Sequence, residues 1–327
     1  MAEPLLVADG IVRSFAMRRR LPFARPRELQ AVAGVSLTVA IGETVGLVGE
    51  SGSGKSTLGR VMAGILPPSA GAVRFAGAAL ANPNDRAATR RQAQRLQLVF
   101  QDTLGALNPR MPIGRQVREV LDIHNLHPAA ERPDRAAACL AEVGIAPTLL
   151  SHYPHEISGG QRQRVVIARA LIAGPELLVC DEPVSALDVS VQAQVIALLQ
   201  TLRRERGLAC LFISHDLRVV RQVSDRIAVM YLGTLVEQAP RAALFANPQH
   251  PYTRALLAAV PVDDPRQRRP RTLLQGEPPS PLDPPTGCRF HPRCPLAEPR
   301  CAAEIPAPHS VAPGHIVACH LASGAPC

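Results

Sequence analysis

Residues 49–56, Gly-Glu-Ser-Gly-Ser-Gly-Lys-Ser, have the types and spacing needed to bind nucleotide phosphates. Glycines let backbone N–H groups turn inward around phosphate oxygens, and a helix that follows adds the positive end of its dipole. Lys55 can reach the β- and γ-phosphates, and the Ser56 hydroxyl can ligate Mg²⁺. Lys55 is also the only lysine among 36 basic residues. We therefore predict that the chain binds a nucleoside triphosphate.

Polar residues follow three other apolar runs. Asp181 and Glu182 come directly after Leu177–Cys180, so they can hold Mg²⁺ and polarise an attacking water. Gln101 and His215 also stand at strand ends, where they can sense the metal or the γ-phosphate. The plainer interpretations are a solvated strand terminus for the two acids and a structural role for a lone histidine. The phosphate loop makes the first of these interpretations weak, and the case for His215 depends on its placement at a strand end.

A second anion site is predicted at Ser158-Gly159-Gly160-Gln161, which precedes a helix expected over about 161–173. Ser158 is a good helix cap, and a glycine-rich helix N-terminus attracts anions. Two phosphate-binding helix termini in one chain call for an explanation.

The elements that must position these residues alternate between strands and helices, which predicts a mostly parallel sheet with ligands at the carboxyl ends of its strands. Residues 103–157 instead carry helices separated by prolines, which indicates a helical insertion into an α/β core. Residues 17–27 form a basic, proline-containing loop, and residues 261–286 a linker rich in proline and arginine. Strands are expected at 5–15, 31–40, 45–48, 72–75, 96–100, 176–181 and 209–213, and further helices after residue 56 and at 85–97 and 189–206.

Composition excludes some classes of function. The net charge is +9, but the arginines are scattered and aromatics make up only 3% of the chain, so we expect no nucleic-acid partner. A general bias toward Ala, Arg and Pro explains the charge better than an anionic membrane surface does. No apolar run approaches the roughly 20 residues of a membrane-spanning helix, and no signal peptide is recognisable. We expect a protein that stays in the cytosol.

The eight cysteines fall into two groups. Cys139, Cys180, Cys210 and Cys327 are isolated, and the first three are expected to fill the core. Cys288, Cys294, Cys301 and Cys319 lie within residues 287–327, a segment too short to hold a core unless something staples it. Four thiolates can bind an iron–sulfur cluster or zinc, and reduced thiols packed against the core are the alternative.

Taken in order, these motifs resemble those of an ATP-binding-cassette (ABC) ATPase. The Ser-Gly-Gly-Gln segment makes the resemblance specific, whereas a phosphate loop alone would not. The resemblance implies a P-loop NTPase core with a mostly parallel sheet and an antiparallel β subdomain. It places the nucleotide-binding domain at 1–260, with a helical subdomain at about 103–172. The motifs are Gly49–Ser56, Gln101, Ile157–Arg164, Leu178–Glu182, Ser185–Asp188 and His215.

In that family two cassettes pair head to tail around ATP, and the resemblance implies roles for individual residues. Glu182 would be the catalytic base, His215 the γ-phosphate switch, and Phe15 the residue stacked on adenine. Asp188 would communicate across the dimer. Phosphate contacts would come from Gly49, Ser51, Gly52, Ser53, Gly54, Lys55, Ser56 and Thr57, Mg²⁺ contacts from Ser56, Gln101 and Asp181, and contacts to the partner's ATP from Ser158, Gly159, Gly160 and Gln161.

The resemblance narrows to the second cassette subunit of oligopeptide/dipeptide permeases, a family that includes nickel permeases. It is carried by Leu107–Met111, Asn247–Thr253 and Gly287–Pro295, although position 103 is Thr where Pro is expected. Some members carry a four-iron cluster on the C-terminal cysteines, which favours [4Fe-4S] over zinc at Cys288, Cys294, Cys301 and Cys319.

The function implied is ATP hydrolysis that powers import of di- or oligopeptides from the cytoplasmic face of the membrane. The partners implied are a paralogous cassette subunit, two integral-membrane permease subunits and, indirectly, an extracytoplasmic solute-binding protein. The alternatives are the same role for nickel or another small solute, or a soluble ABC ATPase outside transport.

Overall fold

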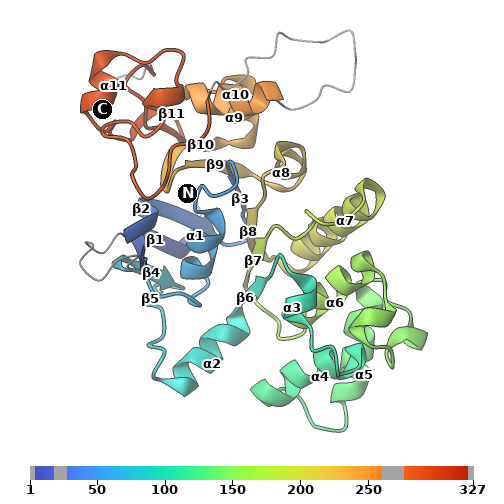
Figure 1. The fold of residues 1–327 in the computed structure, drawn as a ribbon. Helices are drawn as coiled ribbons and strands as arrows, with labels where there is room; N and C mark the ends of the chain where they lie inside the picture. Colours follow the sequence, from blue (N-terminus) through green and yellow to red (C-terminus); the bar gives the residue numbers. More distant parts are fainter. Residues whose placement is uncertain (1–3, 18–27, 260–275, 323–327) are drawn as a thin grey trace. The chain divides into compact units, whose positions relative to one another are not determined.

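The computed structural model describes residues 4–17, 28–259 and 276–322. Figure 1 draws these residues as a ribbon, and they group into two compact units. The first unit lies within residues 1–6, 39–43 and 74–213, and the second within residues 7–38, 44–73 and 214–327. Each unit carries part of the predicted nucleotide chemistry.

Three parallel strands form the centre of the first unit. They are β6 (Leu96–Val99), β7 (Leu177–Asp181) and β8 (Ala209–Ile213), with β7 paired to β6 on one side and to β8 on the other. Every residue of β7 and β8 is buried, as expected for parallel strands covered on both faces. The carboxyl ends of the three strands therefore lie at one edge, where residues 100–101, 182 and 214 follow them.

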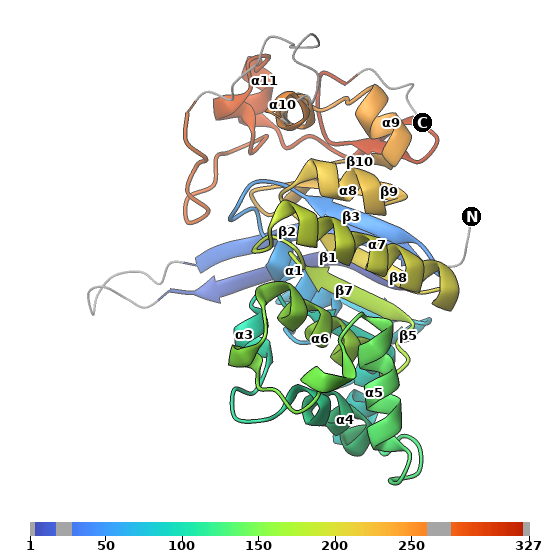
Figure 2. The same ribbon diagram turned by 90° about the vertical axis from the view of Figure 1, so that its right-hand side faces the viewer.

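Helices make up most of the remainder of the first unit. Helices α4, α5 and α6 pack together, as the green part of Figures 1 and 2 shows. The short strand β5 (Ala78–Ala79) pairs antiparallel with Arg74 and Phe75. The helices are α2 (Arg86–Arg95), α3 (Thr103–Ala106), α4 (Ile113–His124), α5 (Arg132–Glu142), α6 (Gly159–Leu171) and α7 (Val189–Arg206), with single 3₁₀ turns at Pro147–Leu149 and Pro154–Glu156.

The second unit has a mixed sheet. Strand β3 (Thr44–Val48) is fully buried and pairs in parallel with β9 (Arg226–Tyr231). Strand β10 (Thr234–Pro240) then adds antiparallel to β9, β12 (His315–Val317) to β10, and β11 (His309–Ala312) to β12. The C-terminal residues thus continue a sheet that begins beside the phosphate loop.

The same unit holds further strands and helices. Strand β1 (Pro4–Ala16) lies between β2 (Glu28–Ala40) and β4 (Ala70–Phe75) in a separate sheet. The helices are α1 (Lys55–Met62), α8 (Leu217–Val223), α9 (Arg241–Ala246), α10 (Pro251–Ala259) and α11 (Pro299–Ala303), with a 3₁₀ turn at His291–Arg293. No helix in the described ranges combines the length and apolar character that crossing a bilayer requires.

The α/β class and most predicted elements agree with the structure. The chain between β6 and β7 contains helices and no strand, as expected for a helical insertion. The sequence interpretation had no prediction for β9, β10, β11 and β12. The basic loop at 17–27, apart from Met17, and residues 261–275 of the predicted linker lie outside the described residues.

Candidate active site

The predicted phosphate loop joins β3 to α1, with Gly54 as the residue before the helix. Two of its glycines are required by the backbone. A Cβ on Gly49 would lie 2.1 Å from the Met230 carbonyl oxygen, and a Cβ on Gly54 would lie 2.1 Å from that of Ala31. Gly54 also has a φ of 101°, which favours glycine. No side chain caps the N-terminus of α1, so its first N–H groups suit an anionic ligand.

Lys55 is buried inside this loop. Its ammonium donates hydrogen bonds to the carbonyl oxygens of Gly49 at 2.9 Å and Glu50 at 2.8 Å. These bonds hold a positive charge against the loop backbone, where a bound phosphate would also lie. The neighbouring Ser56 and Thr57 are half-buried in the first turn of α1.

Two residues without a role in the sequence analysis contact the same loop. The hydroxyl of Tyr252, in α10, accepts a hydrogen bond from the Glu50 backbone N–H at 2.8 Å. The Arg293 guanidinium forms a bidentate ion pair with the Glu50 carboxylate, at 2.7 and 3.1 Å. Both lie in segments singled out by family resemblance, but the separations of 202 and 243 positions gave no signal that they reach the loop.

In the first unit, the polar residues that follow β6 and β7 meet. The Gln101 side-chain amide donates to the Glu182 carboxylate at 2.9 Å. Asp181 is buried at the end of β7, and Glu182 is half-buried. Glu182 has a φ of 47°, a left-handed conformation that is uncommon outside glycine and frequent at functional positions. Its N–H donates to the carbonyl of Ile213 at 3.0 Å, which fixes this conformation next to β8.

The predicted second anion site is a well-formed helix N-terminus. Ser158 caps α6, as predicted: its hydroxyl accepts from the Gln161 N–H at 3.2 Å, and its own N–H donates to the Gln161 side chain at 2.9 Å. The helix begins two residues earlier than expected, so Gly159 and Gly160 are its first residues. A Cβ on Gly160 would lie 2.4 Å from Val191 Cγ1, so the close packing requires glycine there.

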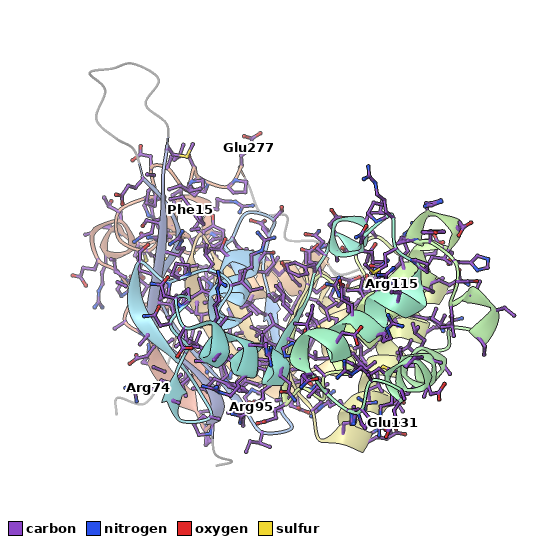
Figure 3. All side chains as sticks on the ribbon, turned by 90° about the horizontal axis from the view of Figure 1, so that it is seen from below. Phe15, Arg74, Arg95, Arg115, Glu131 and Glu277 are labelled. Carbon is purple, nitrogen blue, oxygen red and sulfur yellow. The ribbon has the colours of Figure 1, made fainter. Side chains whose placement is uncertain are left out.

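The remaining predicted residues are exposed or half-buried. His215 is exposed just after β8, and Asp188 is exposed as the residue before α7. Phe15 is half-buried near the end of β1, where Figure 3 labels it. The Arg13 guanidinium lies 4.7 Å from the centre of the Phe15 ring, a cation–π contact.

The two units divide the predicted site residues between them. The first contains Gln101, Ser158, Gly159, Gly160, Gln161, Asp181, Glu182 and Asp188. The second contains the phosphate loop with Thr57, Phe15 and His215.

The four C-terminal cysteines all lie in the second unit. Cys301 and Cys319 are buried, and Cys288 and Cys294 are half-buried. The Cys288 N–H donates to the Cys301 carbonyl at 2.8 Å. Nevertheless, no three His, Cys, Asp or Glu side chains of the described residues are arranged as a metal site. Cys139, Cys180 and Cys210 are buried, as the sequence analysis predicted.

Comparisons with known proteins match both the core and the C-terminal part. The family model described as ABC transporter matches residues 32–185, and the one described as oligopeptide/dipeptide transporter, C-terminal region, matches residues 236–301. Among solved structures, the dimeric post-hydrolysis state of the ATP-binding cassette MJ0796 bound to ADP and Pi is similar, with a TM-score of 0.65 and 27% identity over 72% of this chain and 98% of that one. CbiO1 from Clostridium perfringens, part of the cbiONQ ABC transporter complex, gives a TM-score of 0.62 at 26% identity, over 75% of this chain and 91% of that one.

The fold and the phosphate loop therefore define an ATP-binding-cassette ATPase, an ATP hydrolase. Full-length relatives narrow this class. The oligopeptide transport ATP-binding protein AppF of Bacillus subtilis is 47% identical over 98% of both chains, and a putative peptide import ATP-binding protein of Brucella ovis is 48% identical over 97% of both. The chain belongs to the oligopeptide/dipeptide transporter family of ABC ATP-binding proteins.

Proposed function

We propose that this chain is the ATP-hydrolysing subunit that powers import of di- and oligopeptides by a membrane ABC transporter. The observation that carries the proposal is the full-length match to relatives named for peptide transport, which includes the C-terminal region as well as the cassette. We place a nucleotide-binding domain at residues 1–260, a linker at 261–286 and a C-terminal extension at 287–327.

The nucleotide is ATP, and its phosphates would lie in the loop from Gly49 to Thr57. The buried Lys55 ammonium and the uncapped start of α1 support this placement. Ser56, Gln101 and Asp181 would hold Mg²⁺, which neutralises charge that develops on the phosphates. Serine, amide and carboxylate oxygens are ligands that this cation accepts.

Glu182 would accept a proton from the attacking water, and His215 would contact the γ-phosphate. Glu182 is supported by its strained backbone and by the Gln101 hydrogen bond, which fixes one carboxylate oxygen. Phe15 would stack on adenine, using the half-buried aromatic ring that Arg13 already contacts.

The active form would be a head-to-tail pair of cassettes. Ser158, Gly159, Gly160 and Gln161 would contact the partner's ATP, and Asp188 would lie near the same interface. The capping box at Ser158 leaves the N–H groups of Gly159 and Gly160 at the start of α6 for a phosphate. The dimeric state of MJ0796 with ADP and Pi is consistent with this arrangement. By family resemblance the partner would be a paralogous subunit.

The membrane partners would be two integral-membrane permease subunits, with an extracytoplasmic solute-binding protein acting through them. The chain would then sit peripherally on the cytoplasmic face of the membrane. A groove of about 340 Å³ between α4 and α5 supports docking through the helical insertion. It is lined by Arg115, which Figure 3 labels on α4, and by Arg118, Pro133, Ala137 and Leu150.

The transport proposal is tested by reconstituting the chain, its partner cassette and the permease subunits in vesicles. ATP hydrolysis is then measured with the solute-binding protein alone, with peptide and with Ni²⁺. Stimulation by a mixed peptide library and not by Ni²⁺ is the expected result. Stimulation by Ni²⁺ alone would assign the same ATPase to metal import. Failure to assemble with permease subunits would favour a soluble ABC ATPase.

The finer proposal concerns Cys288, Cys294, Cys301 and Cys319, which we assign to a [4Fe-4S] cluster. Four cysteine thiolates are the donor set that such a cluster needs, and all four lie in the second unit. Among the described residues no three of them are arranged as a metal site, so the assignment rests on the donor set and on family resemblance. A bound cluster would cross-link the extension.

Anaerobic purification followed by iron, sulfide and zinc analysis tests this assignment. About four irons per chain with a broad visible absorption band would support the cluster. Zinc alone would make the four thiolates a structural zinc site, and the absence of both metals would leave reduced thiols.

A further inference from the structure

Residue Glu50 of the phosphate loop is held at three of its polar groups. Its backbone N–H donates to the Tyr252 hydroxyl at 2.8 Å, its carbonyl accepts from Lys55 Nζ at 2.8 Å, and its carboxylate pairs with Arg293 through both oxygens. Lys55 is part of the loop's own chemistry. Tyr252 and Arg293 come from α10 and from the turn at His291–Arg293, so two C-terminal segments converge on one residue of the loop.

The C-terminal partners of Glu50 are fixed by a packed aromatic cluster. The ring centre of Tyr231 lies 4.7 Å from that of Tyr252 and 5.2 Å from that of Phe290, and Tyr252 and Phe290 are 5.4 Å apart. All three rings are fully buried. The chain has only three tyrosines and seven phenylalanines, so this concentration is notable. Interlocking rings restrict the positions that the Tyr252 hydroxyl can take.

Arg293 is likewise restrained, because it is only 8% exposed and its guanidinium lies 5.9 Å from the Tyr231 ring centre. A planar guanidinium in a bidentate pair defines both the distance and the orientation of the carboxylate. The pair therefore transmits the position of the C-terminal turn to the second residue of the phosphate loop.

The pair also has an electrostatic effect. Glu50 places a carboxylate in a loop that must accept a triphosphate, and like charges at short range repel. Arg293 neutralises that carboxylate. Removing the Arg293 charge alone would therefore lower the affinity for ATP more than removing the charges of both Arg293 and Glu50.

We infer that Arg293 and Tyr252 are positioning residues for ATP: they hold the phosphate loop through Glu50, so the C-terminal extension contributes to nucleotide affinity. The inference rests on the proposed role of Gly49–Thr57 as the phosphate site. It does not depend on what the transporter imports. Chemistry at Glu182 should not be affected, so the effect should fall on ATP affinity and KM rather than on kcat.

The test measures binding of ATP to the full-length chain by competition with a fluorescent ATP analogue. We expect Arg293→Gln to raise the Kd about fivefold and Glu50→Gln about twofold, and the double variant to match Glu50→Gln. Tyr252→Phe should raise the Kd about threefold because it leaves the Glu50 N–H without its partner. Arg293→Lys should recover part of the affinity. In the assembled transporter, KM should follow these changes while kcat stays within about twofold.

Two controls separate this inference from its premise. Arg300→Gln removes an arginine of the same extension that forms an ion pair with exposed Glu304, and it should leave the Kd unchanged. Lys55→Ala should abolish binding. If Lys55→Ala binds ATP like the parent chain, the phosphate site itself is wrongly assigned.

If Lys55→Ala no longer binds ATP while a folded Arg293→Gln variant keeps the Kd of the parent chain, the positioning role of Arg293 is overturned. A lowered melting temperature with an unchanged Kd would overturn it too, because that is the result of a purely structural contact. Should Arg293→Gln fail to fold, Glu50→Gln and Tyr252→Phe decide the matter in the same assay. Parent affinity in both of these would reject the inference.

Discussion

Gln101 and Glu182 are 81 positions apart in the chain, yet the Gln101 amide donates a hydrogen bond to the Glu182 carboxylate at 2.9 Å. The contact exists because β6 and β7 are adjacent parallel strands, with Val99 paired to Cys180. Residues that follow the two strands therefore emerge at the same edge. Glu182 has a left-handed backbone at that edge, with a φ of 47°.

This relationship gives a sharp test of the proposed base. In Glu182→Gln the amide keeps the shape of the carboxylate, and its oxygen can still accept from Gln101, but it cannot take a proton from water. We expect ATP binding to persist, a stable ATP-bound dimer to form, and hydrolysis to fall at least about 100-fold. Single-turnover hydrolysis and size-exclusion chromatography with ATP check this. Parent-level hydrolysis in this variant would remove Glu182 from the role of base.

Sequence reasoning located the elements and the residues at their ends more readily than contacts between distant segments. Apolar runs such as Leu177–Cys180 predict buried strands because burial on both faces leaves no alternation. Ser158 was recognised as a cap because capping is local, with its partner three residues away.

Contacts that depend on tertiary packing could not be predicted in the same way. The pairing of Glu50 with Arg293 joins residues 243 positions apart, and no periodicity links them. Strand β12 has only three residues, and its strand conformation depends on pairing with β10 and β11. The positive φ of Glu182 is invisible in sequence, because the residue type does not favour it.

A second prediction concerns pH and the buried His250. Burial, assisted by the nearby Arg254 cation, lowers the pKa of His250 to about 3. In the unfolded chain the pKa returns to about 6.5, so between these values only the unfolded state binds the proton. Unprotonated His250 therefore makes its full contribution to the free energy of unfolding above pH 6.5. That contribution is lost as the pH falls toward 3, by at most about 1.4 kcal/mol per pH unit.

Urea unfolding at pH 7.5, 6.5 and 5.5 measures this effect against His250→Asn, which cannot titrate. The Asn oxygen can still accept a hydrogen bond, as His250 Nδ1 does from the Tyr252 N–H at 3.1 Å. The free energy of unfolding should fall more steeply with acidification in the parent than in the variant. Equal slopes would mean that His250 does not contribute.

A third prediction distinguishes the core thiols from those of the extension. Burial, with a contribution from Glu142, raises the pKa of Cys139 to about 12, so the reactive thiolate is almost absent at neutral pH. Cys180 and Cys210 are buried with their sulfurs 3.9 Å apart. Iodoacetamide at pH 7.5 should leave these three unmodified in the native chain, as judged by peptide mass spectrometry.

Cys288 and Cys294 should behave differently, because both are half-buried. In the metal-free protein, Cys288 and Cys294 should be alkylated before Cys139, although burial also raises the pKa of each of their thiols. In chain purified anaerobically they should be protected if a cluster or zinc holds them. Equal alkylation in the two preparations would argue against a metal at these cysteines.

The last prediction concerns adenine recognition by Phe15. Stacking of a base on an aromatic ring contributes about 1–3 kcal/mol, so Phe15→Ala should raise the Kd for ATP about tenfold. Phe15→Tyr should retain affinity, and binding of inorganic tripolyphosphate, which lacks a base, should be the same in all three chains. Phe245 is a matched control, since it is also half-buried and carries an arginine, Arg221, at 5.1 Å from its ring centre. Phe245→Ala could weaken ATP binding as much as Phe15→Ala does, or tripolyphosphate binding could fall along with ATP binding. Either result would mean that the loss reflects a change in the fold rather than lost stacking, and that another residue contacts the base.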